Sequence, residues 1–296
     1  DVYKRQKPRI AMIGCGVMGT AIASRLIATG YGVTAFDPDR TKVERLAAVG
    51  AAAARSGAEA AAGADAIVLS LNSARIVREA VFGAEGVAAG ARAETIIIDM
   101  SSIEPMATRQ LQAEASAIGL RWLDCPLSGG APKARDGQLT VMAGGEPTDF
   151  ERARPILADL CENLTYMGPS GAGQTTKLVN QVLCALNFVA VAEATRLAVD
   201  AGVDAQKIPA ALRGGRADSA ILQEFMGKMA RNDFSPTGRI DNMVKDLVAV
   251  QSLAMQTGTA MPLTALCMEM HRLLVAAGLG AADNAALVRF YDGPRD

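Results

Sequence analysis

The sequence predicts an α/β domain, with a parallel sheet covered on both faces, followed by an all-α domain. Up to about residue 165, short apolar runs alternate with segments of helical spacing. A stretch rich in glycine and proline follows at 168–173, and after it only helical patterns occur. A chain of 296 residues is long enough for two such domains.

The apolar runs are short and nearly continuous, as expected for strands buried on both faces of a sheet. We expect strands at 9–14, 32–36, 66–71, 95–99, 121–124 and 139–143. Helices are predicted between them at 20–29, 41–49, 76–81 and 105–118, and in the second domain at 174–201, 205–213, 218–230, 239–257 and 262–277. We place the domains at 7–167 and 168–296, and we expect residues 1–6 to be a non-native addition.

Composition excludes several classes of function. The formal net charge of -1 and a pI near 6.0 do not favour a nucleic-acid surface. Five cysteines without a C-x-x-C pair and a single histidine, His271, argue against a disulfide framework or a metal site. No run of about 18 uncharged apolar residues suggests a membrane span. We therefore expect a cytoplasmic protein that acts on a small molecule.

A glycine-rich loop joins the first predicted strand to the first helix. In GCGVMG, Gly14 would make the tight turn, Gly16 would let the backbone approach a pyrophosphate, and Gly19 would allow close packing of helix on strand. The helix N-terminus would offer N–H groups to the phosphates. An acid, Asp37, ends the next strand. This combination predicts a Rossmann-type dinucleotide-binding domain.

Asp37 bears on the choice of cofactor. A carboxylate can accept hydrogen bonds from the ribose hydroxyls of NAD and would repel the 2′-phosphate of NADP. Arg40 adds a positive charge nearby, so NADP stays possible. The alternative is that Asp37 caps the helix that follows Pro38.

Two further segments carry candidate chemistry. Ser128-Gly129-Gly130 follows a predicted strand, and it forms either a nest of N–H groups that suits a carboxylate or an ordinary turn. Lys177 stands in a polar stripe on an otherwise apolar helix, directly after the predicted hinge, and we expect it at a cleft between the domains. With one histidine in the chain, Lys177 is the leading candidate for a general acid/base, and a structural lysine reaching toward solvent is the alternative.

The sequence resembles the β-hydroxyacid dehydrogenase family, which includes 3-hydroxyisobutyrate dehydrogenases and tartronate semialdehyde reductases. Four segments carry the resemblance, which spans residues 9 to 291: GCGVMG at 14–19, DCPLSGGAPKARDGQL at 124–139, GAGQTTKLVNQ at 171–181 and DFSPTGRIDNMVKDL at 233–247. The resemblance implies a Rossmann domain and an all-α domain joined by one long helix. It also implies NAD or NADP as cofactor, and a homodimer or homotetramer in which the second domain serves substrate binding and oligomerisation.

The resemblance implies a role for particular residues. Lys177 would be catalytic, and Ser128, Gly129, Gly130 and Asn180 would bind substrate. The cofactor would be bound by Gly14, Gly16, Val17, Met18, Gly19, Asp37, Asn72, Ser102 and Lys245. Lys245 could instead only pair with Asp241 or Asp246, and His271 is expected to be a structural helix residue.

These inferences predict hydride transfer between NAD(P) and a small 3-hydroxy acid or its semialdehyde. Gln181 after Asn180, and LRGGRADSAILQ at 212–223, are similar to tartronate semialdehyde reductases, whereas the ending GLGAADNAALVRFY differs from the usual family pattern. Two alternatives stay open: a non-catalytic dinucleotide-binding redox sensor, and a reductase of imines or longer semialdehydes on the same fold.

Overall fold

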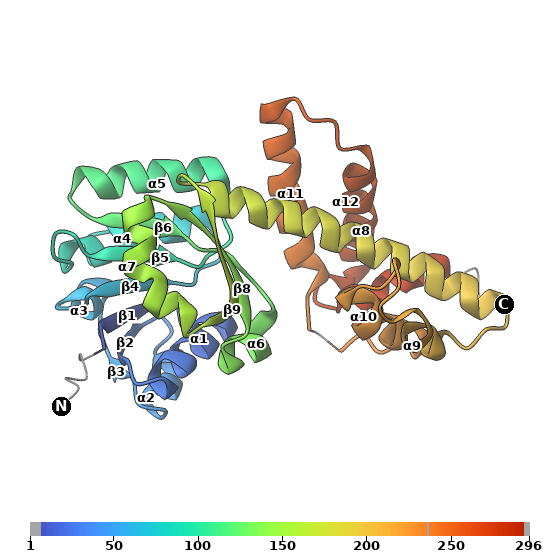
Figure 1. Ribbon diagram of the computed structural model, residues 1–296, viewed down its shortest axis with the longest axis horizontal. Helices are drawn as coiled ribbons and strands as arrows, with labels where there is room; N and C mark the ends of the chain where they lie inside the picture. The colour runs from blue at the N-terminus through green and yellow to red at the C-terminus, as the bar shows by residue number, and fades with distance from the viewer. Residues whose placement is uncertain (1–6, 236, 293–296) are drawn as a thin grey trace. The chain divides into compact units, whose positions relative to one another are not determined.

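The computed structural model describes residues 7–235 and 237–292 (Figure 1). The residues predicted to be non-native, 1–6, lie outside the described part, as does Pro236 of the fourth family-like segment. The chain divides into two compact units, and the division falls between Lys177 and Leu178. It lies inside one long helix, α8 (Ala172–Asp200), which belongs to both units as the predicted joining helix should.

The N-terminal unit is built on one mixed sheet. Its strands are β1 (Arg9–Ile13), β2 (Gly32–Phe36), β3 (Ala52–Ala53), β4 (Ala66–Leu69), β5 (Ile96–Asp99), β6 (Arg121–Asp124), β7 (Leu127–Ser128), β8 (Leu139–Gly145) and β9 (Cys161–Gly168). The strand order is β3-β2-β1-β4-β5-β6-β8-β7, and β9 pairs with β8. The strands from β3 to β6 are parallel, as in a doubly wound nucleotide-binding sheet.

The prediction of a parallel sheet is wrong at its far edge. Strand β8 runs antiparallel to both β6 and β7, and parallel only to β9. The connection from β6 to β8 contains β7 and α6 (Gly130–Asp136). Because β7 itself pairs antiparallel with β8, the chain reverses its direction within this connection.

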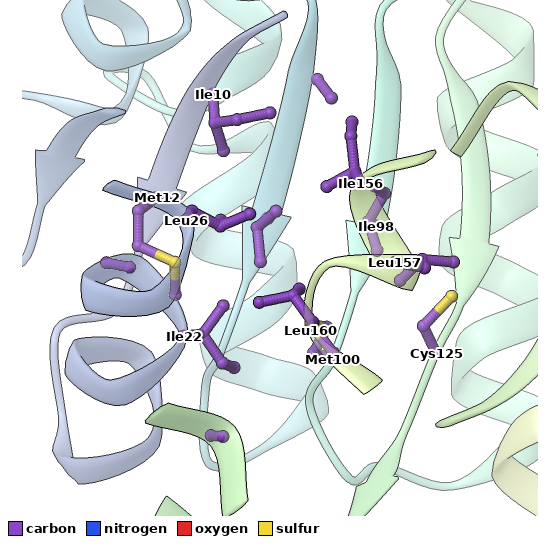
Figure 2. Packing of buried hydrophobic residues seen from close by; sticks show 14 of the residues in the cluster. Ile10, Met12, Ile22, Leu26, Ile98, Met100, Cys125, Ile156, Leu157 and Leu160 are labelled. Atoms are coloured by element: carbon purple, nitrogen blue, oxygen red, sulfur yellow. The ribbon is translucent and has the colours of Figure 1, made fainter. Parts of the chain in front are cut away.

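Helices cover both faces of the sheet. One face carries α1 (Val17–Ala28), α2 (Arg40–Ala47), α6 and α7 (Pro147–Ala158), whose buried side chains share a core cluster with β1, β5 and β6. Figure 2 shows part of this cluster, in which Ile22 and Leu26 of α1 lie near Met12 of β1. The other face carries α3 (Gly57–Ala61), α4 (Ala74–Phe82), the 3-10 turn η1 (Val87–Ala89) and α5 (Pro105–Ala117).

The alternation of side chains along each strand explains the continuous apolar runs. In β1, Ile10 and Met12 enter the first cluster, and Ala11 and Ile13 enter the second. In β5, Ile98 belongs to the first cluster and Ile97 to the second. Every residue of β4 and β5 is therefore buried, as is every residue of β1 and β6 after the first.

Several elements were not predicted. Strands β3, β7 and β9 and helices α3, α6 and α7 are absent from the expectation drawn from the sequence. The two-residue strands β3 and β7 are too short to show any period. Strand β9 has one largely exposed face and polar residues, so it lacks the apolar pattern that identified the others. Helix α7 has buried apolar residues at helical spacing, but Pro155 stands inside it, and an internal proline argues against a helix.

The helical unit begins within α8 and contains α9 (Ile208–Leu212), α10 (Ala220–Ala230), α11 (Ile240–Thr257) and α12 (Pro262–Leu274), which match the predicted helices. It also contains η2 (Ala205–Lys207), the π-helical turn η3 (Val275–Leu279) and the 3-10 helix η4 (Asn284–Tyr291), of which η4 was not predicted. One apolar cluster, including Phe188, Phe225 and Leu247, forms its core, and the rings of Phe188 and Phe225 meet edge to face.

Helix α8 is long and apolar enough to cross a membrane by length and composition alone, and it is the one helix in the described part of the chain that meets this test. The expectation of no membrane span rested on uncharged runs, the longest of which ends before Glu193. Central helices of folded domains have the same length and composition.

Candidate functional site

The candidate cofactor residues gather at one edge of the sheet. The register pairs Ile13 with Phe36 and with Leu69, Leu69 with Asp99, and Asp99 with Asp124, so the carboxyl ends of five strands are level. The glycine loop follows β1 at the point where the strand order reverses, between β2 and β4. Ligands of doubly wound sheets bind outside the carboxyl ends of the strands at this switch point.

Each of the three glycines of the loop is required, or tolerated, for a different physical reason. Gly14 has a φ of +91°, and a Cβ there would lie 2.4 Å from the carbonyl oxygen of Ser70. A Cβ on Gly19 would lie 1.9 Å from the carbonyl oxygen of Gly14, so only glycine allows α1 to pack this close to the loop. A Cβ on Gly16 would meet nothing within 4 Å. Gly16 therefore faces the open space in which a pyrophosphate would fit.

The first turn of α1 is open to a ligand. Gly16 is the N-cap residue and provides no side chain to cap the turn, while Val17 is 75% exposed. Met18 is half-buried and packs against the core cluster of this face. Backbone N–H groups at such an uncapped helix start, together with the helix dipole, suit the phosphates of a dinucleotide.

Asp37 is buried and holds the glycine loop from the end of β2. One carboxylate oxygen accepts the N–H of Cys15 at 2.8 Å, and the other accepts the N–H of Asp39 at 2.9 Å. The cap of α2 is Asp39, whose carboxylate accepts the N–H of Thr41, so the alternative that Asp37 caps this helix does not hold. The oxygen that accepts from Cys15, Oδ2, keeps a further lone pair for a ribose hydroxyl.

A second cation lies beside Asp37 that the sequence analysis did not single out. The ammonium of Lys42 lies 3.4 Å from Asp37 Oδ1, whereas Arg40 is exposed at the start of α2. The spacing of five residues is neither a helical nor a strand spacing, because the chain turns between β2 and α2. Only the folded turn therefore reveals this ion pair.

A pocket of about 270 Å³ adjoins the glycine loop and the end of β2. Its wall is mainly apolar and includes Ile13, Phe36, Leu71 and Ile76, with the guanidinium-bearing Arg75 at its edge. Concave apolar pockets with a few polar groups are typical of cofactor sites. The α4 residues of this pocket were not predicted from the sequence, because nothing in their spacing distinguishes them from an ordinary amphipathic helix.

The loops after β4 and β5 are joined by hydrogen bonds. Ser101 Oγ accepts the N–H of Leu71 at 3.0 Å, and the N–H of Ser101 donates to Asp99 Oδ1 at 3.0 Å. Asn72 is exposed next to this contact, and Ser102 is half-buried beside Ser101. The structure thus brings the two predicted cofactor residues onto neighbouring, mutually bonded loops.

Two buried carboxyl groups lie side by side at the ends of β5 and β6. Burial raises the pKa of Asp99 to about 7, against hydrogen bonds from Ser101 that lower it. Burial raises the pKa of Asp124 to about 6, against backbone hydrogen bonds from Gly171 and Gln174 that lower it. Asp99 Oδ2 has no hydrogen-bond partner among the described residues. Neither group was singled out from the sequence.

The Ser128-Gly129-Gly130 segment ends β7 and begins α6. Ser128 is half-buried, and both glycines are exposed with φ values of +125° and +72°. Such left-handed backbone favours glycine, and a nest of N–H groups is built from backbone of this kind. Whether the segment binds a carboxylate stays a prediction.

Lys177 lies in the second turn of α8 and is half-buried. The start of this helix is capped by Asp124, whose carboxylate oxygens accept the N–H of Gly171 at 2.8 Å and of Gln174 at 2.9 Å. Because Asp124 ends β6, Lys177 belongs to a helix that starts at the same sheet edge as the glycine loop. The sequence analysis had no signal for this cap.

In the helical unit, the polar residues after Lys177 form a chain of contacts. Asn180 donates to Gln181 at 2.9 Å, and Gln181 donates to Asp246 at 2.6 Å. Asp246 also pairs with Lys245 at 3.3 Å, one of the two pairings considered for that lysine. The other carboxylate considered, Asp241, pairs with Arg239.

Histidine and cysteine do not contribute a second site. His271 is fully buried in α12, and its Nδ1 lies 2.8 Å from the carbonyl oxygen of Cys267. Among the described residues, no group of three or more histidine, cysteine, aspartate or glutamate side chains is placed to hold a metal.

Comparison with known proteins agrees with this geometry. Residues 9–168 match the family model described as the NAD binding domain of 6-phosphogluconate dehydrogenase, and residues 171–291 match the NAD-binding model of NADP-dependent 3-hydroxyisobutyrate dehydrogenase. The 2-hydroxy-3-oxopropionate reductase of Escherichia coli K12 is 36% identical over 95% of this chain and 96% of its own. The chain belongs to the β-hydroxyacid dehydrogenase family.

Other members of the β-hydroxyacid dehydrogenase family match over nearly the whole chain. The NAD-dependent L-serine dehydrogenase of Pseudomonas aeruginosa is 33% identical over 96% of this chain and 98% of its own. The structure of Mycobacterium tuberculosis 3-hydroxyisobutyrate dehydrogenase with L-serine has a TM-score of 0.88 at 31% identity, and it covers 97% of this chain and 99% of its own. As a member of this family, the protein is an NAD(P)-dependent oxidoreductase with a Rossmann-type domain followed by a helical domain.

Proposed function

We propose that this β-hydroxyacid dehydrogenase interconverts a small 3-hydroxy acid and its semialdehyde, with Lys177 as the acid/base. The observation that carries the proposal is the cap of α8 by Asp124. It starts the helix of Lys177 at the sheet edge where the open space at Gly16 receives the cofactor. Relatives named for 2-hydroxy-3-oxopropionate, L-serine and L-threonate support this class of substrate.

The chain's own residues have separate tasks in the proposed reaction. The bound nicotinamide cofactor supplies or accepts the hydride. When the hydroxy acid is oxidised, Lys177 takes the proton from the hydroxyl oxygen, and when the semialdehyde is reduced, Lys177 returns a proton to the carbonyl oxygen. The N–H groups of Gly129 and Gly130, with Ser128, hold the substrate carboxylate. Asn180, three residues after Lys177 on α8, orients the substrate hydroxyl.

We propose NAD as the preferred cofactor. The buried carboxylate of Asp37 faces the glycine loop and would repel a 2′-phosphate. Lys42 partly offsets that repulsion, because its ammonium already pairs with Asp37. Asn72, Ser102 and Lys245 are proposed as further cofactor contacts, each on the basis of the family resemblance.

We also propose the division into a cofactor domain at 7–167 and a substrate and oligomerisation domain at 168–296. A cytoplasmic homodimer or homotetramer, without a nucleic-acid or membrane partner, fits these roles. The five cysteines are all free thiols, as expected in a reducing compartment.

The substitution Lys177→Ala tests the reaction. Turnover would be followed at 340 nm with NAD and with NADP, on 3-hydroxyisobutyrate, glycerate, serine, threonate and 4-hydroxybutyrate. We expect one of these acids to be oxidised faster with NAD, and Lys177→Ala to lower kcat by about 10²- to 10⁴-fold. The affinity for NADH, measured by fluorescence, should stay within about twofold, because the phosphates and adenine bind elsewhere.

Lys207→Ala is the matched control, since Lys207 is a strongly exposed lysine in the helical unit. It should leave both turnover and NADH affinity unchanged. Turnover that survives Lys177→Ala would exclude the proposed acid/base. Tight NADH binding without turnover of any acid in the panel would instead favour the non-catalytic redox sensor.

A further inference from the structure

Gln174 is a buried amide whose nitrogen and oxygen each form one hydrogen bond with the backbone. Its side chain belongs to the first turn of α8 and the residue is 1% exposed. The amide Nε2 donates to the carbonyl oxygen of Ser101 at 2.8 Å, and Oε1 accepts the N–H of Ile103 at 3.2 Å. A buried primary amide is costly unless such partners are present, and an apolar side chain of similar size would fill the same space without them.

The two backbone groups that Gln174 holds lie on either side of Ser102. The side chain therefore forms hydrogen bonds with the loop after β5 on both sides of the residue proposed to contact the cofactor. Ser101 extends the connection, because its Oγ accepts the N–H of Leu71, next to Asn72. One glutamine thus links α8 to both loops that carry proposed cofactor residues.

Gln174 also lies on the same face of α8 as Lys177, three residues before it. Its backbone N–H donates to Asp124 Oδ2, so the same residue takes part in the cap of the helix. Displacement of the first turn would move Lys177 with it, since backbone hydrogen bonds join each helical turn to the next.

The close approach of α8 to the sheet explains the second glycine of the GAG segment. A Cβ on Gly173 would lie 2.4 Å from the carbonyl oxygen of Met142 and 2.7 Å from that of Asp124. A Cβ on Gly144 would lie 2.7 Å from Asp124 Oδ1. Backbone contacts of this kind fix how closely the helix approaches the sheet, but they do not hold the loop at 101–103.

We propose that Gln174 is a positioning residue, which fixes loop 101–103 against the first turn of α8 and so holds Ser102 and Lys177 at a constant separation. The inference rests on the proposed function, because it is there that Lys177 and Ser102 have roles. A misplacement of reacting groups by about 1 Å can cost on the order of 100-fold in rate, so a hydrogen-bonded link between the two is functionally significant.

Gln174→Met is the direct test, since methionine conserves length and volume but makes neither hydrogen bond. We expect kcat to fall about 10- to 100-fold with a smaller change in KM, because geometry is lost rather than substrate contact. NADH should bind several-fold more weakly, as loop 101–103 is released. The amide of Ile103 should lose its acceptor and exchange with deuterium faster.

Gln223→Met is the matched control. Gln223 is a half-buried glutamine of α10 whose amide donates to Pro209 O and to Asp218 Oδ1, both at 2.7 Å. Gln223→Met therefore measures the general effect of losing a glutamine that forms two side-chain hydrogen bonds. It should leave kcat, NADH affinity and exchange at Ile103 unchanged.

Gln174→Glu adds a readout that a purely structural role would not change. The deprotonated carboxylate keeps an acceptor for Ile103 but faces the carbonyl oxygen of Ser101 without a donor. Protonation restores a donor there, so the affinity of this variant for NADH should recover as pH falls, whereas that of Gln174→Met should not. This variant also serves if Gln174→Met fails to fold.

The outcomes separate this proposal from the proposed function. If Lys177→Ala abolishes turnover but Gln174→Met matches Gln223→Met in kcat and NADH affinity, the positioning role is overturned and the acid/base role stands. If Lys177→Ala has no effect on turnover, the proposed function fails, and NADH affinity and Ile103 exchange still decide whether Gln174 holds the loop. Unchanged exchange at Ile103 in both Gln174 variants would overturn the proposal.

Discussion

The two units of this protein bury their apolar side chains to different extents. Among the described residues, five large hydrophobic side chains are exposed in the N-terminal unit and twelve in the smaller helical unit. The sheet of the N-terminal unit is covered on both faces by helices, so its two core clusters are complete. The helical unit has one cluster, and α8, α11 and α12 each expose apolar residues. Helices on both faces of the sheet therefore bury most large apolar side chains of the N-terminal unit, whereas the helical unit leaves more of them exposed.

The units also differ in the purpose of their buried polar groups. In the N-terminal unit, Asp99, Asp124 and Gln174 lie at the candidate site. In the helical unit, the buried carboxylate of Asp283 accepts N–H bonds from Thr237 and Gly238 and pairs with Lys228 at 3.5 Å, which ties the segment before α11 to the start of η4. The buried polar groups named in the first unit therefore lie at the candidate site, whereas Asp283 and Lys228 hold two segments of the second unit together.

The largest effect is expected for Asp283→Ala. The substitution leaves Lys228 buried without its carboxylate and removes several acceptors, which should cost about 3–5 kcal/mol of the free energy of unfolding. Far-UV circular dichroism reports both units, whereas the fluorescence of Trp122, the one tryptophan, reports the N-terminal unit. We expect the dichroism transition in denaturant to split and its first part to move to lower concentration.

The Trp122 transition should stay in place, because Asp283 belongs to the other unit. Equal shifts of both signals would show that the two units unfold as one. The difference in burial between the units would then not be accompanied by a difference in their stability.

An intermediate effect is expected from pH. The pKa of Asp99 is raised by burial from 3.8 to about 7, so in this window the folded state keeps a proton that the unfolded state has lost. Its contribution to the free energy of unfolding is complete below pH 3.8 and is lost as pH rises through about 7. Between pH 5 and 8 the N-terminal unit should lose on the order of 2 kcal/mol, measured by Trp122 fluorescence in denaturant.

Asp99→Asn should reduce this loss, because the amide does not titrate. A smaller slope of the same sign should persist in the variant, since the pKa of Asp124 is also raised by burial. A Trp122 transition that strengthens as pH rises would contradict the assignment.

The helical unit should respond to pH in the opposite direction. Burial lowers the pKa of His271 below 6.5, so its contribution is present above pH 6.5 and is lost as pH falls through the folded pKa. The free energy of unfolding should therefore fall with rising pH when it is measured by Trp122 fluorescence. It should rise with pH when it is measured by the helical part of the dichroism.

The smallest effect on stability is expected for Leu266→Glu on α12, where Leu266 is 62% exposed. A surface substitution of this kind should change the free energy of unfolding by no more than about 0.5 kcal/mol. If the exposed apolar faces of the helical unit are covered by a second copy, the mass measured by light scattering should fall. Val49→Glu, at an exposed valine of the N-terminal unit, is the control and should not change it. If Leu266→Glu leaves the mass unchanged, this face of α12 does not take part in oligomerisation.

The sequence was sufficient to predict an element or a site wherever the pattern lies within one short segment. The apolar runs located β1, β2, β4, β5 and β6, and helical spacing located the helices of the second unit, because burial on both faces or on one stripe leaves a period in the sequence. The glycine loop and Asp37 were found because the contacts of a tight turn demand glycine at fixed spacing. The polar stripe on an apolar helix singled out Lys177, and the family resemblance implied roles for Asn180, Ser102 and Lys245. All of these roles remain predictions.

Other features were decided only in three dimensions. The reversal of β8, the ion pair of Lys42 with Asp37, and the pocket wall contributed by α4 depend on which strands and turns become neighbours. The cap of α8 by Asp124 joins residues 47 and 50 positions apart, and the grip of Gln174 on loop 101–103 spans more than 70. No local period encodes such contacts, because hydrogen bonds between distant segments depend on where the sheet edge brings their backbones together. The sequence thus determined which residues could carry the chemistry, and the tertiary structure decided what holds them in place.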